Sequence, residues 1–235
     1  DIPAVGLGGP QTREPGNPET REPGNPRTRN TDARQQPKRG TNMTVSTNSF
    51  QKIMDTAEAL IQEKGCRQMT LQDIIRSSGL SKGAIYHYVS SKDELLGLVL
   101  KSRVEKANQR FNEAANDPNS SGLERPLRAI AEGMARASSY ENVTNKIFIY
   151  LLSQMDQPKV AELVEEIHDY TLRTCSSWIE AGKKAGFIPA EADSAKLAES
   201  LILFMYGMRT HSAATRRNNS ITVEELVQFM RRTLS

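Results

Sequence analysis

The apolar residues that follow Ser49 recur at intervals of three and four, the spacing of an amphipathic helix. The first stripe comprises Phe50, Ile53, Met54, Ala57, Leu60 and Ile61. Gly65 follows this stripe, and glycine commonly ends a helix. No later segment shows the alternation of a half-buried strand. We therefore predict an all-α fold of about nine helices.

The remaining helices are separated by short segments rich in Gly, Pro, Asn and Ser. Two short helices are expected after Thr70 and Ser81, and a long one after Ser91, because Ser and Thr are favourable N-caps. Residues 118–122 form a loop between this long helix and the next. Further helices are predicted over 124–138, 143–154, 158–185, 193–216 and 222–234.

The first 42 residues differ in composition from the rest. They hold seven of the eleven prolines, six of the fifteen glycines and no aromatic residue, and the sequence Arg-Glu-Pro-Gly-Asn-Pro occurs at 13–18 and at 21–26. Such a segment buries too little apolar surface to offset its ordering entropy. We predict a disordered tail over residues 1–48. It is either a basic arm that contacts DNA or sequence upstream of a native start at Met43.

The formal net charge of +3 is weak support for nucleic-acid binding. Residues 1–42 contribute +2 of it, and residues 43–95 hold six basic and six acidic side chains. A DNA-binding face must therefore arise from how the charges are placed.

Residues 70–92 read TLQDIIRSSGLSKGAIYHYVSSK. Two short helices joined by a tight turn that contains Gly79 are typical of a helix-turn-helix. The apolar positions of this segment would face inward, namely Ile74, Ile75, Leu80, Ile85 and Val89. The polar residues from Ser81 to Tyr88 are then left near the outer face. Small residues at 83 and 84 would allow close approach to a DNA groove.

Residues 50–96 resemble the DNA-binding domain of the TetR family of bacterial repressors. The resemblance lies in the threonine that starts the second helix, Gly-Leu-Ser-Lys-Gly in the turn, Ile-Tyr-His-Tyr in the recognition helix, and Ser-Lys-Asp-Glu-Leu-Leu. It implies a three-helix head over 49–92 and a ligand-sensing and dimerisation domain over 93–235. It also implies a homodimer that binds a palindromic operator in double-stranded DNA and is released by a ligand. An activator or a ligand-independent regulator on the same fold remains an alternative.

The resemblance also assigns DNA contacts. Lys92 would bind phosphate, Lys82 guanine or phosphate, and Gln72 an adenine edge. Solvent exposure of Gln72 and packing of Tyr88 against the first helix remain alternatives. The complete expected set is Thr70, Gln72, Ser81, Lys82, Gly83, Ala84, Tyr86, His87, Tyr88 and Lys92.

The C-terminal half is rich in Met and aromatic residues at helical spacing. These residues form either ordinary core or the wall of a pocket for a small hydrophobic effector, such as a lipophilic drug, a fatty acyl compound or an aromatic metabolite. The candidate wall residues are Met134, Phe148, Met155, His168 and Trp178. The resemblance further implies that the last two helices form the dimer interface, with Leu201, Phe204, Met205, Met208, Leu226 and Met230 as candidates.

Signals of catalysis and of membrane insertion are weak. Glu165-x-x-His168 has the spacing of a di-iron carboxylate motif, but a second copy is missing, so an enzyme is the lesser alternative. We expect no catalytic residue, no metal and no cofactor. Cys66 and Cys175 suggest two reduced thiols. No apolar run reaches the ~18 residues of a membrane span. We therefore expect a cytoplasmic protein.

Overall fold

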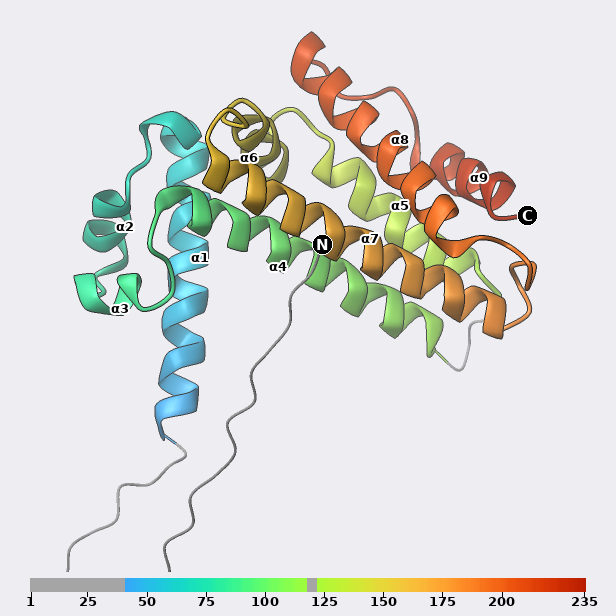
Figure 1. The fold of residues 1–235 in the computed structure, drawn as a ribbon, viewed down its shortest axis with the longest axis horizontal. Coiled ribbons are helices and arrows are strands. Elements are labelled where there is room, and N and C mark those ends of the chain that lie inside the picture. The colour runs from blue at the N-terminus through green and yellow to red at the C-terminus, as the bar shows by residue number, and fades with distance from the viewer. Residues whose placement is uncertain (1–40, 118–121) are drawn as a thin grey trace, which may run out of the picture. The chain divides into compact units, whose positions relative to one another are not determined.

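A computed structural model describes residues 41–117 and 122–235, and most of the predicted tail, residues 1–40, lies outside the described residues. Within them the chain is helical without strands (Figure 1), which confirms the predicted all-α class. The nine helices are α1 (Thr41–Gln68), α2 (Leu71–Ser78), α3 (Lys82–Tyr86), α4 (Lys92–Ala115), α5 (Glu124–Ala137), α6 (Val143–Leu152), α7 (Pro158–Lys184), α8 (Ser194–Thr215) and α9 (Val223–Thr233).

The first helix differs from the prediction at both ends. It begins at Thr41, so the predicted tail boundary at residue 48 is wrong. Residues 41–48 carry no apolar stripe, and periodicity therefore gave no sign of a helix there. At the other end Gly65 has a φ of 78°, which interrupts the helix as predicted, but the chain adds one more turn that ends at Gln68.

Side-chain caps fix the start of most helices. Thr70 and Asp73 form a capping box at α2, and Thr222 and Glu225 form another at α9. The Ser91 hydroxyl accepts a hydrogen bond from the backbone N–H of Glu94 at the start of α4. Each such cap contributes about 1 kcal/mol. The helix starts expected after Thr70, Ser81 and Ser91 are confirmed because these signals act within four residues.

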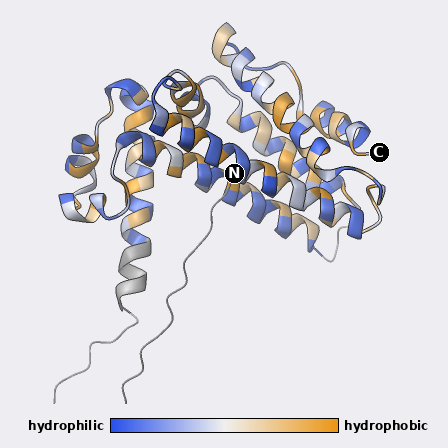
Figure 2. Ribbon diagram, viewed as in Figure 1, coloured by the Kyte–Doolittle hydropathy of each residue, from blue (hydrophilic) through white to orange (hydrophobic). Residues whose placement is uncertain are grey.

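Two apolar clusters hold the helices together. One joins α1, α2 and α3 to the first half of α4 and to α6, and includes the fully buried Ile53, Ile85 and Leu96. The other joins α5, α8, α9 and the second half of α7. Figure 2 shows hydrophobic and hydrophilic residues interspersed along the helices of the described part of the chain. Helix α4 packs against α5, α6 and α7, so one continuous helix links the head, α1–α3, to the remaining helices.

Helices α4 and α7 lie close together at Gly97. A Cβ atom at Gly97 would lie 2.7 Å from Cδ1 and 3.1 Å from Cγ of Leu163, closer than van der Waals contact allows. Gly97→Ala should therefore lower the free energy of unfolding by ~1–3 kcal/mol through overpacking. Denaturant titration measures the effect. Leu163→Ala in the same chain should restore much of it, and losses that simply add would show that the two positions do not interact.

Candidate DNA-binding face and effector cavity

The helix-turn-helix is fixed by a glycine turn and a buried carboxylate. Gly79 caps α2 with a φ of 65°, and its N–H donates to the Ile75 carbonyl over 3.2 Å. The Asp73 carboxylate pairs with Lys64 of α1 at 2.7 Å and with Arg76 at 2.6 Å. Hydrogen bonds from Lys64 and from Thr70 lower the pKa of Asp73 to about 2. The carboxylate is therefore ionised at neutral pH and ties α2 to α1.

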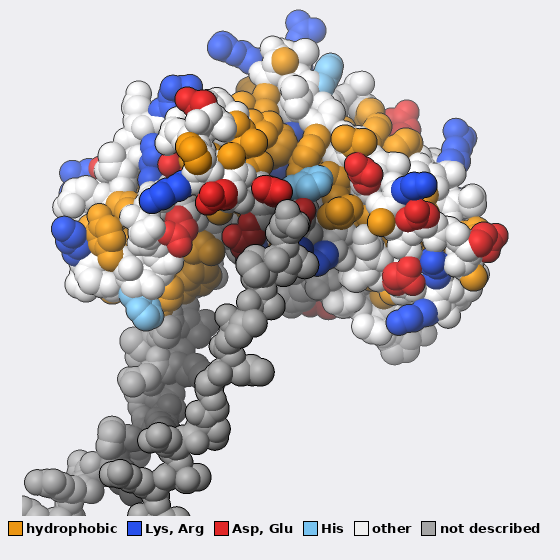
Figure 3. Space-filling view, viewed as in Figure 1, with side chains coloured by type: hydrophobic (Ala, Val, Ile, Leu, Met, Phe, Trp, Pro, Cys, Tyr) orange, Lys and Arg blue, Asp and Glu red, His pale blue; other side chains and the backbone are white. Residues whose placement is uncertain are grey.

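Seven of the predicted DNA contacts are exposed around α2 and α3, including Thr70 and Ser81, whose hydroxyls are engaged in helix caps. The other five have no such role. These five are Gln72, Lys82, Gly83, Tyr86 and His87. Tyr86 is 47% exposed although its ring is large and apolar, and the Lys82 ammonium lies 5.5 Å from the centre of that ring. The face drawn in Figure 3 carries Lys, Arg, Asp and Glu side chains side by side. The placement of the exposed side chains around α3, and not the net charge, therefore provides the surface that can bind DNA.

Three of the predicted contacts, Thr70, Ser81 and Tyr88, have structural roles in this conformation. The Thr70 hydroxyl donates to Asp73 Oδ2 over 2.8 Å, and the Ser81 hydroxyl accepts from the Ala84 N–H over 3.1 Å. Tyr88 is half-buried with its ring centre 5.5 Å from that of Phe50 in α1, as the alternative of packing against the first helix predicted. Ala84 is also half-buried. Helix α3 is short and ends at Tyr86.

Lys92 is engaged within the protein. Its Nζ donates to the carbonyls of Cys66 and Arg67 at 3.0 and 3.3 Å, and it lies 5.0 Å from the centre of the Tyr150 ring in α6. Lysine at the C-terminal end of a helix complements the carbonyls left without partners there. Lys92 therefore connects the end of α1 to α4 and α6, in addition to any phosphate contact.

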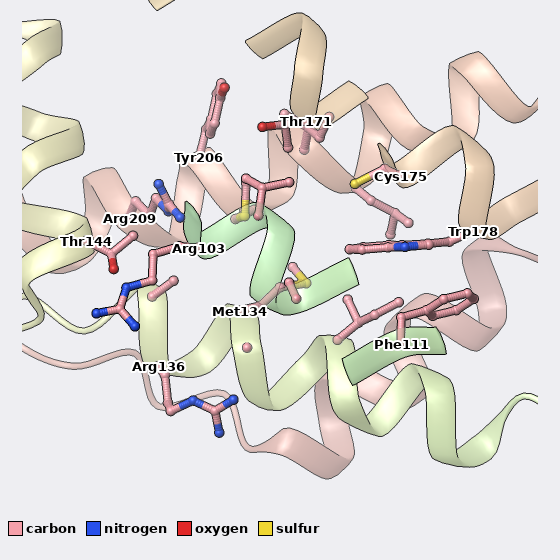
Figure 4. A pocket seen from close by; sticks show the side chains of 18 of the residues that line it. Arg103, Phe111, Met134, Arg136, Thr144, Thr171, Cys175, Trp178, Tyr206 and Arg209 are labelled. Atoms are coloured by element: carbon pink, nitrogen blue, oxygen red, sulfur yellow. The ribbon is translucent and has the colours of Figure 1, made fainter. Parts of the chain in front are cut away.

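A cavity of about 370 Å³ lies among α4, α5, α6, α7, α8 and α9. Its volume is in the range of small-molecule sites. Three of the predicted wall residues line it, namely Met134, Phe148 and Trp178. The Trp178 indole stacks on Phe111 with ring centres 5.2 Å apart and donates its N–H to Asn108 Oδ1 over 2.7 Å. Figure 4 shows Trp178 and Phe111 together at one end of the cavity.

Two predicted wall residues do not line the cavity. Met155 is 43% exposed because α6 ends at Leu152 and the side chain of Met155 follows in a turn at the surface. His168 Nδ1 lies 3.2 Å from the Tyr206 hydroxyl, and Tyr206, not His168, reaches the cavity wall. Helical spacing alone did not distinguish these positions from their neighbours.

The opposite end of the cavity is polar, which the sequence analysis missed. Arg209, Tyr206, Thr144 and Arg103 line this end, and Figure 4 shows them away from Trp178. One signal was present in the sequence: Arg209 is the sole Lys, Arg, Asp or Glu between Glu199 and Arg216, within an apolar helix. Charged side chains are almost never fully buried unless they are paired. A lone arginine in an apolar helix is therefore a signal of a binding site.

The predicted dimer residues divide into two groups. Met208, Leu226 and Met230 are buried inside the protomer, so their prediction as surface contacts is wrong. Leu201, Phe204 and Met205 are half-buried, and Phe204 stacks on Phe229 of α9 with ring centres 4.1 Å apart. By contrast, Leu203 is 63% exposed and was not predicted. Helix α8 is apolar on most sides. Some of these sides pack on α7 and α6, and another side exposes Leu203.

The remaining chemistry gives no sign of a reactive centre. Both cysteines are free, and burial raises the pKa of Cys66 to about 11 and that of Cys175 to about 12, so both stay as thiols at neutral pH. Within the described residues, no group of three or more His, Cys, Asp or Glu side chains is placed to hold a metal ion. No helix in that part of the chain is long and apolar enough to span a membrane.

Comparison with known proteins places this geometry among bacterial regulators. Residues 53–99 match the family described as bacterial regulatory proteins, tetR family. The HTH-type transcriptional repressor KstR2 of Rhodococcus jostii is 29% identical over 91 residues, which cover 39% of this chain and 41% of that protein. An uncharacterized HTH-type transcriptional regulator of Bacillus subtilis, YfiR, is 20% identical over 135 residues, which cover 57% of this chain and 65% of that protein. The chain thus spans less than two thirds of the length of either relative.

The fold is also similar to that of solved structures. The fatty acid degradation regulator FadR of Bacillus halodurans aligns with a TM-score of 0.61 at 17% identity, over 77% of this chain and 97% of that chain. The relatives with similar sequences are transcriptional regulators and not enzymes.

Proposed function

We propose, because the chain belongs to the TetR family of bacterial helix-turn-helix transcriptional regulators, that it represses transcription as a homodimer on a palindromic operator and leaves the DNA when a small molecule fills its cavity. In this proposal the head, predicted over 49–92, binds DNA. Residues 93–235 sense the ligand and form the dimer.

The exposed residues around α3 support the DNA-binding part. Lys82 and Tyr86 are exposed, and Gly83 leaves room for close approach to a groove floor. Phosphate contacts would position the head, and contacts to base edges would give specificity. A dimer would place two copies of α3 about 34–36 Å apart, one DNA turn, which is the geometry of a palindrome.

An exposed stripe on α8 supports the dimer. Ser200, Leu203, Gly207, Thr210 and Ala214 are exposed and follow one another at intervals of three and four. They form one helix face, and most of them are small, so a second helix could approach closely. Leu203, the large apolar residue of this stripe, gains a buried environment when a second copy packs on it.

The course of α4 is the observation that carries the proposed mechanism. Its first residue, Lys92, binds the carbonyls at the end of α1, while Leu100, Val104 and Phe111 further along the same helix line the cavity. A ligand that displaces α4 would therefore move the head. Such a ligand releases DNA only if it binds the DNA-free conformation more tightly than the DNA-bound one.

The test is genome-wide capture of bound DNA fragments with the full chain, followed by gel-shift titration of the recovered sites. We expect a small set of palindromic sites whose affinity falls steeply with salt. A bound promoter whose transcription rises when the gene is deleted supports repression. Transcription that falls on deletion would support the alternative of an activator. Failure to recover any specific site would contradict the proposal.

Lys82→Ala and Lys92→Ala should affect different properties. Lys82 is exposed beside the Tyr86 ring, where it could contact a base or a phosphate. Loss of one such contact should weaken operator binding by about tenfold. The melting temperature should stay unchanged, because the side chain lies at the surface. Lys92 donates to two carbonyls, so its loss should lower the free energy of unfolding by ~1–3 kcal/mol as well. Thermal melts and gel shifts measure both. An unchanged melt for Lys92→Ala would show that the amine is free for phosphate.

A further inference from the structure

We infer, on the basis of the proposed ligand-sensing function, that the effector is an amphipathic organic anion. Its carboxylate would bind Arg209 at one end of the cavity, and its apolar body would extend toward Trp178 at the other. The sequence predicted a small hydrophobic effector. The polar end of the cavity adds a carboxylate to that molecule.

Arg209 is a buried cation without a counter-ion. Its residue is 8% exposed, its Nε has no hydrogen-bond partner, and no salt bridge to it is found within the described residues. Its guanidinium lies 4.9 Å from the centre of the Phe148 ring, which offsets part of the loss of hydration. A buried charge without a partner is strongly unfavourable. An anionic ligand would remove that penalty.

The guanidinium keeps its charge at neutral pH. Burial lowers the pKa of Arg209 to about 10, and the neighbouring Tyr206 opposes this shift slightly. The group therefore remains protonated at pH 7 and can form two parallel hydrogen bonds with a carboxylate.

Three other arginines lie on the cavity wall, and two of them already have acidic partners. Arg103 pairs with Glu58 of α1, and Arg136 lies 3.8 Å from Glu132 with half of its side chain exposed. Arg110 and Lys106 also line the cavity but are exposed to solvent, so Arg209 is the buried cation of the wall whose charge is left for a ligand. Thr144 lines the same end of the cavity and is buried, so its hydroxyl is available to the second carboxylate oxygen.

A buried polar network holds Arg209 in place. Asn145 Nδ2 donates to the Arg209 carbonyl over 3.3 Å and to Ser212 Oγ over 3.0 Å, and Ser212 Oγ donates to the Arg209 carbonyl over 3.0 Å. Asn145 and Ser212 are almost fully buried. These hydrogen bonds fix helix α8 to α6 at this residue. A carboxylate bound to Arg209 would therefore affect the positions of both helices.

The rest of the cavity suits an apolar body. Figure 4 shows Met134 between the polar end, with Arg209 and Thr144, and the aromatic end, with Phe111 and Trp178. The Trp178 N–H is already bonded to Asn108, so this end offers aromatic and aliphatic surface to a ligand. A molecule with a charged head and an apolar tail matches both ends, whereas a sugar or a dication matches neither.

The test compares molecules that differ in the head group. The probes are 4-phenylbutyrate, 4-phenylbutan-1-ol and 4-phenylbutylamine, and as a second set octanoate, 1-octanol and octylamine. Binding to the full chain is followed by Trp178 fluorescence and by thermal shift. In at least one set, the acid should bind at least tenfold more tightly than its alcohol and amine. Arg209→Met should reduce binding of that acid to the level of the alcohol and leave binding of the alcohol unchanged.

Arg173→Met is the matched control, because Arg173 is exposed on α7 and does not line the cavity. It should keep the preference for the acid. Arg209→Met should also melt at a higher temperature than the unliganded wild type, since it removes a buried unpaired charge. A lower melting temperature would mean that the charge is paired in the folded protein, and would overturn the inference. So would an acid that binds no better than its alcohol in both sets, or a preference that survives in Arg209→Met.

Operator binding without any probe is measured in parallel, so that the two proposals can fail separately. If a neutral alcohol releases operator DNA and the acids do not, the inference is overturned while the proposed function stands. If the acids bind through Arg209 but the unliganded protein binds no specific DNA, the proposed function fails and the inference stands.

Discussion

Leu203→Glu should convert the protein into a monomer and weaken operator binding by at least ~100-fold, because half of the palindrome contacts are lost. Leu203 is 63% exposed and is the large apolar residue of the exposed stripe on α8. In a twofold dimer each substitution appears twice at one interface, and a buried unpaired carboxylate costs several kcal/mol. Light scattering of the purified variant gives the oligomeric state, and gel shifts give the affinity.

Ile221→Glu is the matched control for this substitution. Ile221 is an exposed aliphatic residue before α9 and lies outside the stripe, so a carboxylate there should leave dimer and affinity unchanged. Because Leu203 makes its contacts at the surface, the monomer should keep its helical content. A Leu203→Glu protein that remains a dimer with wild-type affinity would place the interface elsewhere on the chain.

The proposed dimer face also shows what the sequence pattern could not predict, namely which apolar residues of α8 are exposed. In α8 nearly every position between 201 and 208 is apolar, so periodicity could not separate the side that packs on α7 from the side that faces outward. The prediction therefore included Met208, which is buried inside the protomer, and omitted Leu203. Burial depends on which helices surround α8, and that information lies far away in the sequence.

Local signals were predictive by comparison. Thr70, Ser91 and Thr222 start helices through hydrogen bonds that reach no further than the next turn, and Gly79 supplies the left-handed backbone of the turn before α3. These contacts depend on residues close in sequence, and so the order and most bounds of the helices followed from them. The start of α1 at Thr41 carries no comparable apolar pattern and was missed.

The cavity was predicted only in outline. Met134, Phe148 and Trp178 line it as expected, whereas Met155 follows the end of α6 and His168 turns to Tyr206. Its polar end depends on Arg209, whose lack of an acidic partner cannot be read from the composition of α8. Pairing of charges is a property of the packed structure, and α1 supplies Glu58 to Arg103 while no acidic group in the described chain reaches Arg209.

Gly133→Leu should produce a repressor that binds DNA but no longer responds to the effector. Gly133 lies in α5 and lines the cavity, and a Cβ atom there would meet nothing within 4 Å. A leucine side chain would therefore occupy the space of the ligand without a clash. Replacing glycine inside a helix also removes a destabilising residue worth about 1 kcal/mol, so the melting temperature should not fall. Binding of 4-phenylbutyrate, followed by Trp178 fluorescence, should weaken by at least ~100-fold, as expected when several ligand atoms lose their space.

The matched control is Glu162→Leu, which puts the same side chain at an exposed position of α7, outside the cavity wall. It should retain both ligand binding and release of operator DNA. In Gly133→Leu, operator affinity without ligand should match the wild type, because the head and the exposed stripe on α8 are untouched. If the leucine instead weakens operator binding as a ligand would, a filled cavity is itself the signal for release, and α4 responds to occupancy of the cavity alone. If ligand still binds and releases DNA as in the wild type, the effector occupies a different site.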